Sequence, residues 1–156
     1  DLRGLMEPRT ASALKRLTTV SALASAGVPV GIMNAPIIPG LNDHEIPSIL
    51  KAASEAGART AGMTIVRLNG SIGRIFEDWL KKNYPNKFDK VWNQISAAHG
   101  GNVSDSQFGR RMKGEGAYAE AIHHLFRSSK KKYFQDRSMP AYDLMKFSKG
   151  GTIRLF

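Results

Sequence analysis

The residues best suited to bind a ligand follow two apolar segments of the chain, at the point where each segment ends. In the corner at residues 34–43, Ile38 offers an apolar surface to a flat ring and Gly40 allows a backbone to approach closely. At residues 66–70, Arg67 ends an apolar run and needs a carboxylate, a phosphate or solvent as its partner. Each site also has a plain structural interpretation: a strand–turn–helix junction for the corner, and an arginine that reaches past the strand end.

Glu7 and Arg9 flank Pro8 just before the first predicted helix. Proline favours an extended conformation in the residue before it. If a strand lies upstream, both charged residues stand at its carboxyl end, where parallel α/β proteins bind their ligands. The alternative is a charged approach to the helix.

Histidine and cysteine usage argues against a metal site within these 156 residues. The absence of cysteine excludes disulfides, thiolate zinc sites, a cysteine nucleophile and a cysteine-held iron–sulfur cluster. His123 and His124 are adjacent, and adjacent side chains on a helix point about 100° apart, so they do not chelate one ion together.

Basic residues outnumber acidic ones by 23 to 13, which gives a formal charge of +10. A basic surface attracts DNA, RNA or phosphorylated ligands. The candidates for nucleic-acid contact are Arg110, Arg111 and Lys113 in a glycine-rich stretch, and Lys130, Lys131 and Lys132 at a helix end. The alternative is a solvated helix end that serves solubility.

Hydrophobic periodicity predicts that residues 1–70 alternate between helices and strands. The predicted elements are a helix from Thr10 or Ser12 to Gly27, a strand at 28–38, a helix capped by Asn42 or Asp43 and ending at Gly57, and a strand at 59–68. A strand–helix–strand unit of this kind needs a crossover connection, so the strands are predicted to be parallel. Both strands are apolar throughout, as is typical of strands buried on both faces.

The rest of the chain is predicted to be helical, at residues 72–80, 88–95 and 118–134. Residues 135–156 have no sustained period and are predicted to be a mobile basic tail. The chain is therefore divided into an α/β part at 1–70, a helical C-terminal extension at 71–134 and the tail.

Two parallel strands cannot form a stable sheet alone, because each large aliphatic side chain left exposed forgoes roughly 1.5–3 kcal/mol. The chain also begins with Asp1 and not Met. We expect it to be the later part of a partial (β/α) TIM-like barrel, completed by a missing N-terminal half or by self-association through the exposed strands. No apolar run reaches the roughly 18 residues of a membrane span and no secretory leader is visible, so we expect no membrane contact and a cytoplasmic location.

Seven segments of the chain form a recognisable set. They are residues 5–10 (LMEPRT), 28–33 (VPVGIM), 35–43 (APIIPGLND), 56–59 (AGAR), 76–80 (FEDWL), 84–85 (YP) and 108–116 (FGRRMKGEG). Together they resemble the later part of a radical S-adenosylmethionine protein, in the DNA-repair-photolyase-like group related to spore photoproduct lyase. The resemblance implies a partial barrel, a CxxxCxxC loop that holds a [4Fe–4S] cluster, and hydrogen abstraction by a 5′-deoxyadenosyl radical from a nucleic-acid lesion.

The resemblance also implies ligand contacts. The superfamily motif GxIxGxxE aligns with Pro36, Ile38, Gly40 and Asp43, and departs at its first and last positions. Ile38 would pack on the adenine, and the backbone beside Arg67 and Leu68 would lie at the adenine edge. Asn34 and Glu7 would face the ribose and methionine parts of S-adenosylmethionine.

Because the chain lacks cysteine, the resemblance implies that the cluster is held elsewhere and that this part alone is inactive. The main alternative is a non-catalytic nucleic-acid-binding α/β domain. A complete phosphosugar-binding α/β domain is disfavoured because only two strands are predicted. Residues 152–156 loosely resemble the terminal motif that binds the bacterial sliding clamp, although Thr152 and Arg154 depart from it.

Overall fold

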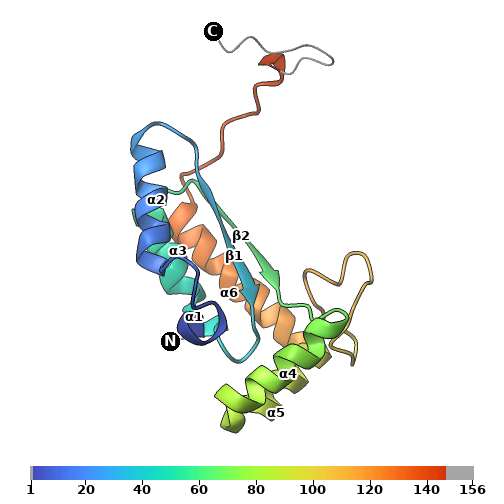
Figure 1. Ribbon diagram of the computed structural model, residues 1–156. Coiled ribbons are helices and arrows are strands. Elements are labelled where there is room, and N and C mark those ends of the chain that lie inside the picture. Colours follow the sequence, from blue (N-terminus) through green and yellow to red (C-terminus); the bar gives the residue numbers. More distant parts are fainter. Residues whose placement is uncertain (1, 147–156) are drawn as a thin grey trace.

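The chain forms a mixed α/β structure in which two parallel strands lie among helices (Figure 1). The computed structural model describes residues 2–146, so the expected clamp motif at 152–156 lies outside the described residues. The helices are α1 (Leu2–Met6), α2 (Ala13–Ser25), α3 (Ile46–Glu55), α4 (Ser71–Asn83), α5 (Phe88–Ala98) and α6 (Gly116–Phe134), and the strands are β1 (Gly31–Ile37) and β2 (Thr60–Ile65). The predicted order of elements is confirmed, and α1 is an addition to it.

The ends of α2 and α3 follow from their sequences. The Ser12 side chain accepts a hydrogen bond from the Lys15 N–H at 3.3 Å and caps the start of α2. Beyond α3, Gly57 has a φ of +98°, and a Cβ there would lie 2.6 Å from the Ala24 Cβ of α2. Only glycine fits both the left-handed backbone and this close approach, so Gly57 allows α2 to pack beside α3.

Strands β1 and β2 pair in parallel, as predicted. Their register places Asn34 opposite Met63 and, after an irregularity, Ile37 opposite Ile65. The Val66 N–H then donates to the Ile37 carbonyl at 2.8 Å. Parallel pairing brings both strand ends to one edge, which we call the carboxyl edge: the ends of β1 and β2 with the residues that follow them.

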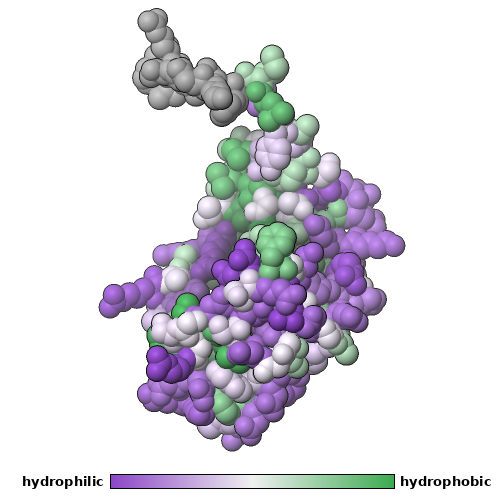
Figure 2. All heavy atoms as spheres, turned by 90° about the vertical axis from the view of Figure 1, so that its right-hand side faces the viewer, coloured by the Kyte–Doolittle hydropathy of each residue, from purple (hydrophilic) through white to green (hydrophobic). Residues whose placement is uncertain are grey.

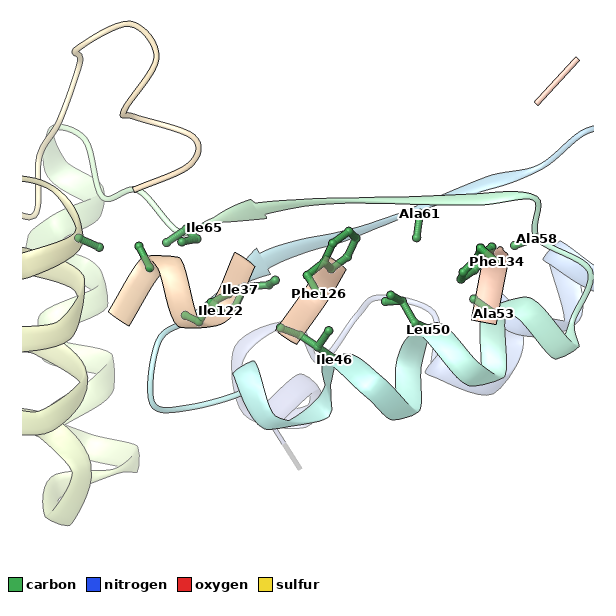
Figure 3. Close-up of a cluster of buried hydrophobic side chains, with 12 residues drawn as sticks. Ile37, Ile46, Leu50, Ala53, Ala58, Ala61, Ile65, Ile122, Phe126 and Phe134 are labelled. Atoms are coloured by element: carbon green, nitrogen blue, oxygen red, sulfur yellow. The ribbon is translucent and has the colours of Figure 1, made fainter. Parts of the chain in front are cut away.

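Helices α2, α3 and α6 cover one face of the two strands. Figure 3 shows apolar side chains, Leu50 and Phe126 among them, between the strands and helices α3 and α6. The buried members of this cluster are Ile37, Ile46, Leu50, Ala53, Ala58, Ala61, Ile65, Ala98, Ala119, Ile122, Phe126 and Phe134. Leu17 and Val20 of α2 pack against them. The segments 1–70 and 71–134 therefore share one core.

The opposite face of the strands is open. Met33 is 65% exposed there, and Gly31 and Ala35 beside it are also exposed. The prediction that both strands are buried on both faces is therefore wrong for this chain. The reason is that α2, α3 and α6 all pack on the other face, while the open face carries mostly small side chains with little apolar area to bury.

A second apolar cluster lies at the carboxyl edge, against α4 and α5. Its buried members are Ile38, Leu41, Val66, Leu68, Phe76, Leu80, Val91 and Ile95. Leu2 and Met6 of α1 pack against this cluster, and Trp79 Nε1 of α4 donates to the Leu5 carbonyl at 3.1 Å. These contacts hold the short helix α1 at the carboxyl edge.

The segment after α6, predicted as a mobile tail, is attached to α3 at its start. Arg137 Nη1 donates to the carbonyls of Ser54 and Ala58 at 2.6 and 2.8 Å. Carbonyls at a helix end lack a partner within the helix, so Arg137 caps the C-terminal end of α3. Among the helices of residues 2–146, none combines the length and the apolar character needed to cross a bilayer.

Candidate ligand-binding site at the carboxyl edge

Two adjoining hollows lie at the carboxyl edge. The first, of about 370 Å³, is lined in part by Glu7, Asn34 and Ile38. The second, of about 560 Å³, is lined in part by Ile38, Arg67 and Leu68. The two hollows share Met6, Ala35, Pro36 and Ile38. Five of the six residues predicted to contact a ligand therefore surround one edge of the sheet, although they come from three separate parts of the sequence.

Asn42 braces the corner between β1 and α3. Its Oδ1 accepts a hydrogen bond from the Ile38 N–H at 2.7 Å, and its Nδ2 donates to the Pro36 carbonyl at 3.2 Å. It makes no capping hydrogen bond to the helical turn that follows, so its predicted role as an N-cap is wrong. Because asparagine can bond backbone groups on both sides of a turn, it instead fixes Ile38 at the junction of the hollows.

One residue that lines the first hollow has a buried polar atom without a hydrogen-bond partner. Asn34 Nδ2 is buried and makes no hydrogen bond, an arrangement that costs about 1–3 kcal/mol. Glu7 is exposed and already paired, since its Oε2 accepts from Arg16 Nη2 at 3.3 Å and from Thr10 Oγ1 at 3.2 Å. Asn34 Nδ2 is therefore a buried donor at this hollow that lacks an acceptor.

Ile38 stands between the two hollows but is only 1% exposed. Leu2 and Met6 of α1 pack against the cluster that contains it. A ligand that packs on the Ile38 side chain has to displace a neighbour, and Met6 is a neighbour that lines both hollows. The short helix α1 therefore limits access to Ile38.

Gly40, the sixth predicted residue, lines neither hollow. Its φ is +75°, and a Cβ there would collide with Gln94 Oε1 of α5. The missing side chain at Gly40 therefore lets α5 pack closely against this backbone, and does not make room for a ligand. Nearby, Asp43 Oδ2 accepts a hydrogen bond from the Tyr118 hydroxyl at 2.9 Å. Burial, and then this hydrogen bond, raise the pKa of Tyr118. The corner is thus attached to both α5 and α6.

Two of the six cations predicted to contact nucleic acid are held by acceptors of the chain itself. Arg110 Nε donates to Asp105 Oδ2 at 2.7 Å, and its Nη1 donates to Glu115 Oε1 at 2.8 Å. Lys130 Nζ donates to the Ala61 carbonyl of β2 at 2.7 Å. The charge of Arg110 and the donor of Lys130 are therefore engaged in stabilising the fold.

The other four cations, Arg111, Lys113, Lys131 and Lys132, form no ion pair with a described residue. The Arg111 guanidinium lies 5.8 Å from the centre of the Phe108 ring, and Phe108 is 88% exposed. The Lys132 ammonium lies 5.3 Å from the ring centre of Tyr133. An exposed aromatic ring beside a cation was not anticipated from the sequence.

A buried polar network was also missed. The His99 ring is fully buried, with Nε2 2.7 Å from the Val66 carbonyl and Nδ1 3.4 Å from Asp105 Oδ2. A carbonyl only accepts, so Nε2 carries a proton. The Arg110 hydrogen bond, followed by the Gln107 N–H, lowers the pKa of Asp105 to about 2. A signal was present in the sequence, since an acidic residue lies five positions before and five positions after Arg110.

The resemblance implies a [4Fe–4S] cluster and S-adenosylmethionine. The chain has no cysteine, so its residues do not fit the cluster. The first hollow, with the unpartnered Asn34 donor, fits a polar ligand such as the ribose of S-adenosylmethionine. Among the described residues, no three His, Asp or Glu side chains are grouped so that they could hold a metal ion. Compared with family models, curated proteins and solved structures, the chain matches none of them.

Proposed function

We propose that the carboxyl edge binds the adenosyl part of S-adenosylmethionine, and that the chain is the later part of the barrel of a radical S-adenosylmethionine enzyme. One observation carries this proposal. Glu7, Asn34, Ile38, Arg67 and Leu68, which the resemblance assigns to the ligand, line two adjoining hollows at the edge where parallel strands bind ligands.

In this proposal each residue contacts a different part of the ligand. Asn34 Nδ2 donates to a ribose oxygen, because it is buried and has no other acceptor. The Leu68 N–H is already bonded to the Val103 carbonyl at 3.3 Å, so the adenine edge is read by the backbone of Arg67. Ile38 contacts the adenine face once Met6 has moved aside.

The proposal limits what this chain does alone. Its residues cannot hold the cluster, so the ligands of the cluster come from another polypeptide segment and the 156 residues are inactive by themselves. The open face at Gly31, Met33 and Ala35 is then the inner wall of the barrel. By the same resemblance, the enzyme as a whole acts on a nucleic-acid lesion.

The test is a titration of the ¹⁵N-labelled chain with S-adenosylmethionine, followed by amide chemical shifts. We expect saturable shifts at residues 34–38 and 66–68, because binding without the cluster is weak but local. Asn34→Leu should remove the shifts, whereas Asn93→Leu should keep them, since Asn93 is exposed on α5 and lines neither hollow. Shifts scattered over the molecule, or unaffected by Asn34→Leu, would rule the site out.

Nucleic-acid binding is a second candidate, favoured by the exposed ring of Phe108. The loop that carries Phe108 is held by the ion pairs of Arg110, and Arg111 lies beside the ring. Aromatic rings next to cations bind unpaired bases by stacking. A fluorescence-anisotropy titration with single-stranded DNA should show an affinity that falls steeply with salt. Phe108→Ala should weaken it and Tyr142→Ala, which removes another exposed ring, should not; equal effects would dismiss this candidate.

A further inference from the structure

The second hollow differs in chemistry from the first. Its lining is apolar except for Thr64 and Arg67, and it contains no acidic residue. The apolar lining residues are Met6, Ala35, Pro36, Ile38, Ile65, Val66, Leu68, Ile72, Ile75, Phe76, Trp79 and Met112. One cation in an apolar hollow attracts a ligand that is itself apolar and carries a negative charge.

Arg67 is held at the wall of this hollow by its neighbours in the chain. Val66 and Leu68 are buried, and their N–H groups donate to the carbonyls of Ile37 at 2.8 Å and Val103 at 3.3 Å. The Arg67 guanidinium makes no ion pair or hydrogen bond with a described residue. Arg74 and Arg111 also lack an ion pair with a described residue, but Arg67 is the arginine that lines this hollow.

The wall formed by α4 leaves apolar area in contact with water. Ile72 is 55% exposed and Ile75 66% exposed, and both line the hollow. Figure 2 views the molecule from the side of α4 and shows hydrophobic side chains in separate patches within a mostly hydrophilic surface. A ligand that covers this apolar area removes it from water, which favours binding.

We propose that the second hollow binds a small organic anion with an apolar or aromatic body, whose carboxylate, phosphate or sulfonate pairs with Arg67. This deepens the proposed function by naming the class of a second ligand. It rests on that function in placing the ribose at Asn34 in the first hollow and the adenine edge at the Arg67 backbone, which leaves the Arg67 guanidinium and the wall formed by α4 for the second ligand. The volume of about 560 Å³ lies within the range of small-molecule sites. A planar guanidinium binds each of these anionic groups through two parallel hydrogen bonds. Cationic ligands are disfavoured because the hollow has no carboxylate.

The test uses 1-anilinonaphthalene-8-sulfonate as the probe, without S-adenosylmethionine. We expect saturable binding with blue-shifted fluorescence, weakened about tenfold by Arg67→Gln, because a charge-assisted hydrogen bond is lost. Arg74→Gln is the matched control, since Arg74 is exposed on α4 but does not line the hollow. Ile75→Gln should also weaken binding, whereas Leu14→Gln, at an exposed leucine of α2, should not.

Competition then identifies the chemistry of the ligand. 1-Naphthoate and 1-naphthyl phosphate should both displace the probe, and neutral 1-naphthylmethanol should not. The stronger competitor tells whether a carboxylate or a phosphate is preferred. Equal probe binding by the Arg67→Gln and Arg74→Gln variants, displacement by the neutral alcohol, or no saturable binding would overturn this proposal. Because the probe is titrated alone, these outcomes leave the adenosyl shifts at Asn34 as a separate result.

Discussion

The two sides of the β1–β2 pair differ in what they bury and in what they leave unpaired. On the covered side, Leu50 and Ile65 are almost completely buried against α3 and α6. On the open side, Met33 is exposed. At the carboxyl edge, the buried Asn34 Nδ2 has no hydrogen-bond partner and the Arg67 guanidinium has no ion pair with a described residue. The difference indicates that the covered side of the strands provides stability, whereas the carboxyl edge provides the groups available for binding.

The largest expected effect is a difference in the free energy of unfolding between substitutions on the two sides of the strands. Leu50→Ala should lower the free energy of unfolding by about 2–5 kcal/mol, because it removes buried methyl groups and leaves a cavity. Met33→Ala on the open face should change it by less than about 0.5 kcal/mol. Urea unfolding of both variants measures the difference. Equal losses would mean that the open face is also a packed core.

A second comparison contrasts two neighbouring arginines in the loop after α5. Arg110→Met removes both ion pairs and should speed amide hydrogen exchange at residues 104–114 by about tenfold, because local opening becomes easier. Arg111→Met should leave exchange there nearly unchanged, since the Arg111 guanidinium lies beside the exposed Phe108 ring and forms no ion pair with a described residue. If both substitutions speed exchange alike, the Arg110 pairs do not hold the loop.

The same loop predicts a dependence on pH. The pKa of Asp105 falls from 3.8 to about 2 on folding, so its ionised form stabilises the fold fully above about pH 4. This stabilisation is lost as the pH falls from about 4 to about 2. The free energy of unfolding should therefore decline more steeply over this window in the wild type than in Asp105→Asn. Parallel curves would show that the Arg110 contact does not perturb Asp105.

The smallest effect concerns the corner on the binding side. Tyr118→Phe removes the hydrogen bond to Asp43 and should cost about 1 kcal/mol of stability. Since it leaves both hollows intact, the amide shifts with S-adenosylmethionine should persist. Loss of those shifts in a folded Tyr118→Phe variant would show that ligand binding depends on the contact between α6 and the corner, although Tyr118 lines neither hollow.

The order of elements and the parallel pairing could be predicted because they depend on local patterns. Glycines such as Gly27 and Gly57, with apolar runs between them, mark the ends of helices and strands in the sequence itself. The covering of a single face could not be predicted, because it depends on where α6 packs, far along the chain from β1. The ion pairs of Arg110 were not predicted for the same reason: its basic, glycine-rich surroundings resemble a binding loop, and only the folded loop brings Asp105 and Glu115 to it.

Part of the candidate site could be predicted for a simple reason. Residues that end two parallel strands necessarily meet at one edge, so Asn34 and Arg67 were grouped correctly without any knowledge of side-chain contacts. The helix α1 over that edge could not be foreseen, because Leu2–Met6 carries no capping signal. Asn42 was misjudged because an asparagine before a helix can cap it or brace the preceding turn, and the choice depends on the backbone geometry.

The central claim, that the carboxyl edge binds an adenosyl group, is tested most directly by photolabelling with an 8-azidoadenine derivative of S-adenosylmethionine. Tryptic peptides 17–51 and 60–67 contain the ends of β1 and β2, whereas peptide 52–59 lies at the opposite edge. We predict labelling of 17–51 and 60–67 at residues 34–38 and 66–67, suppressed by excess S-adenosylmethionine. Labelling concentrated on peptide 52–59, or labelling that excess S-adenosylmethionine does not suppress, would contradict the claim.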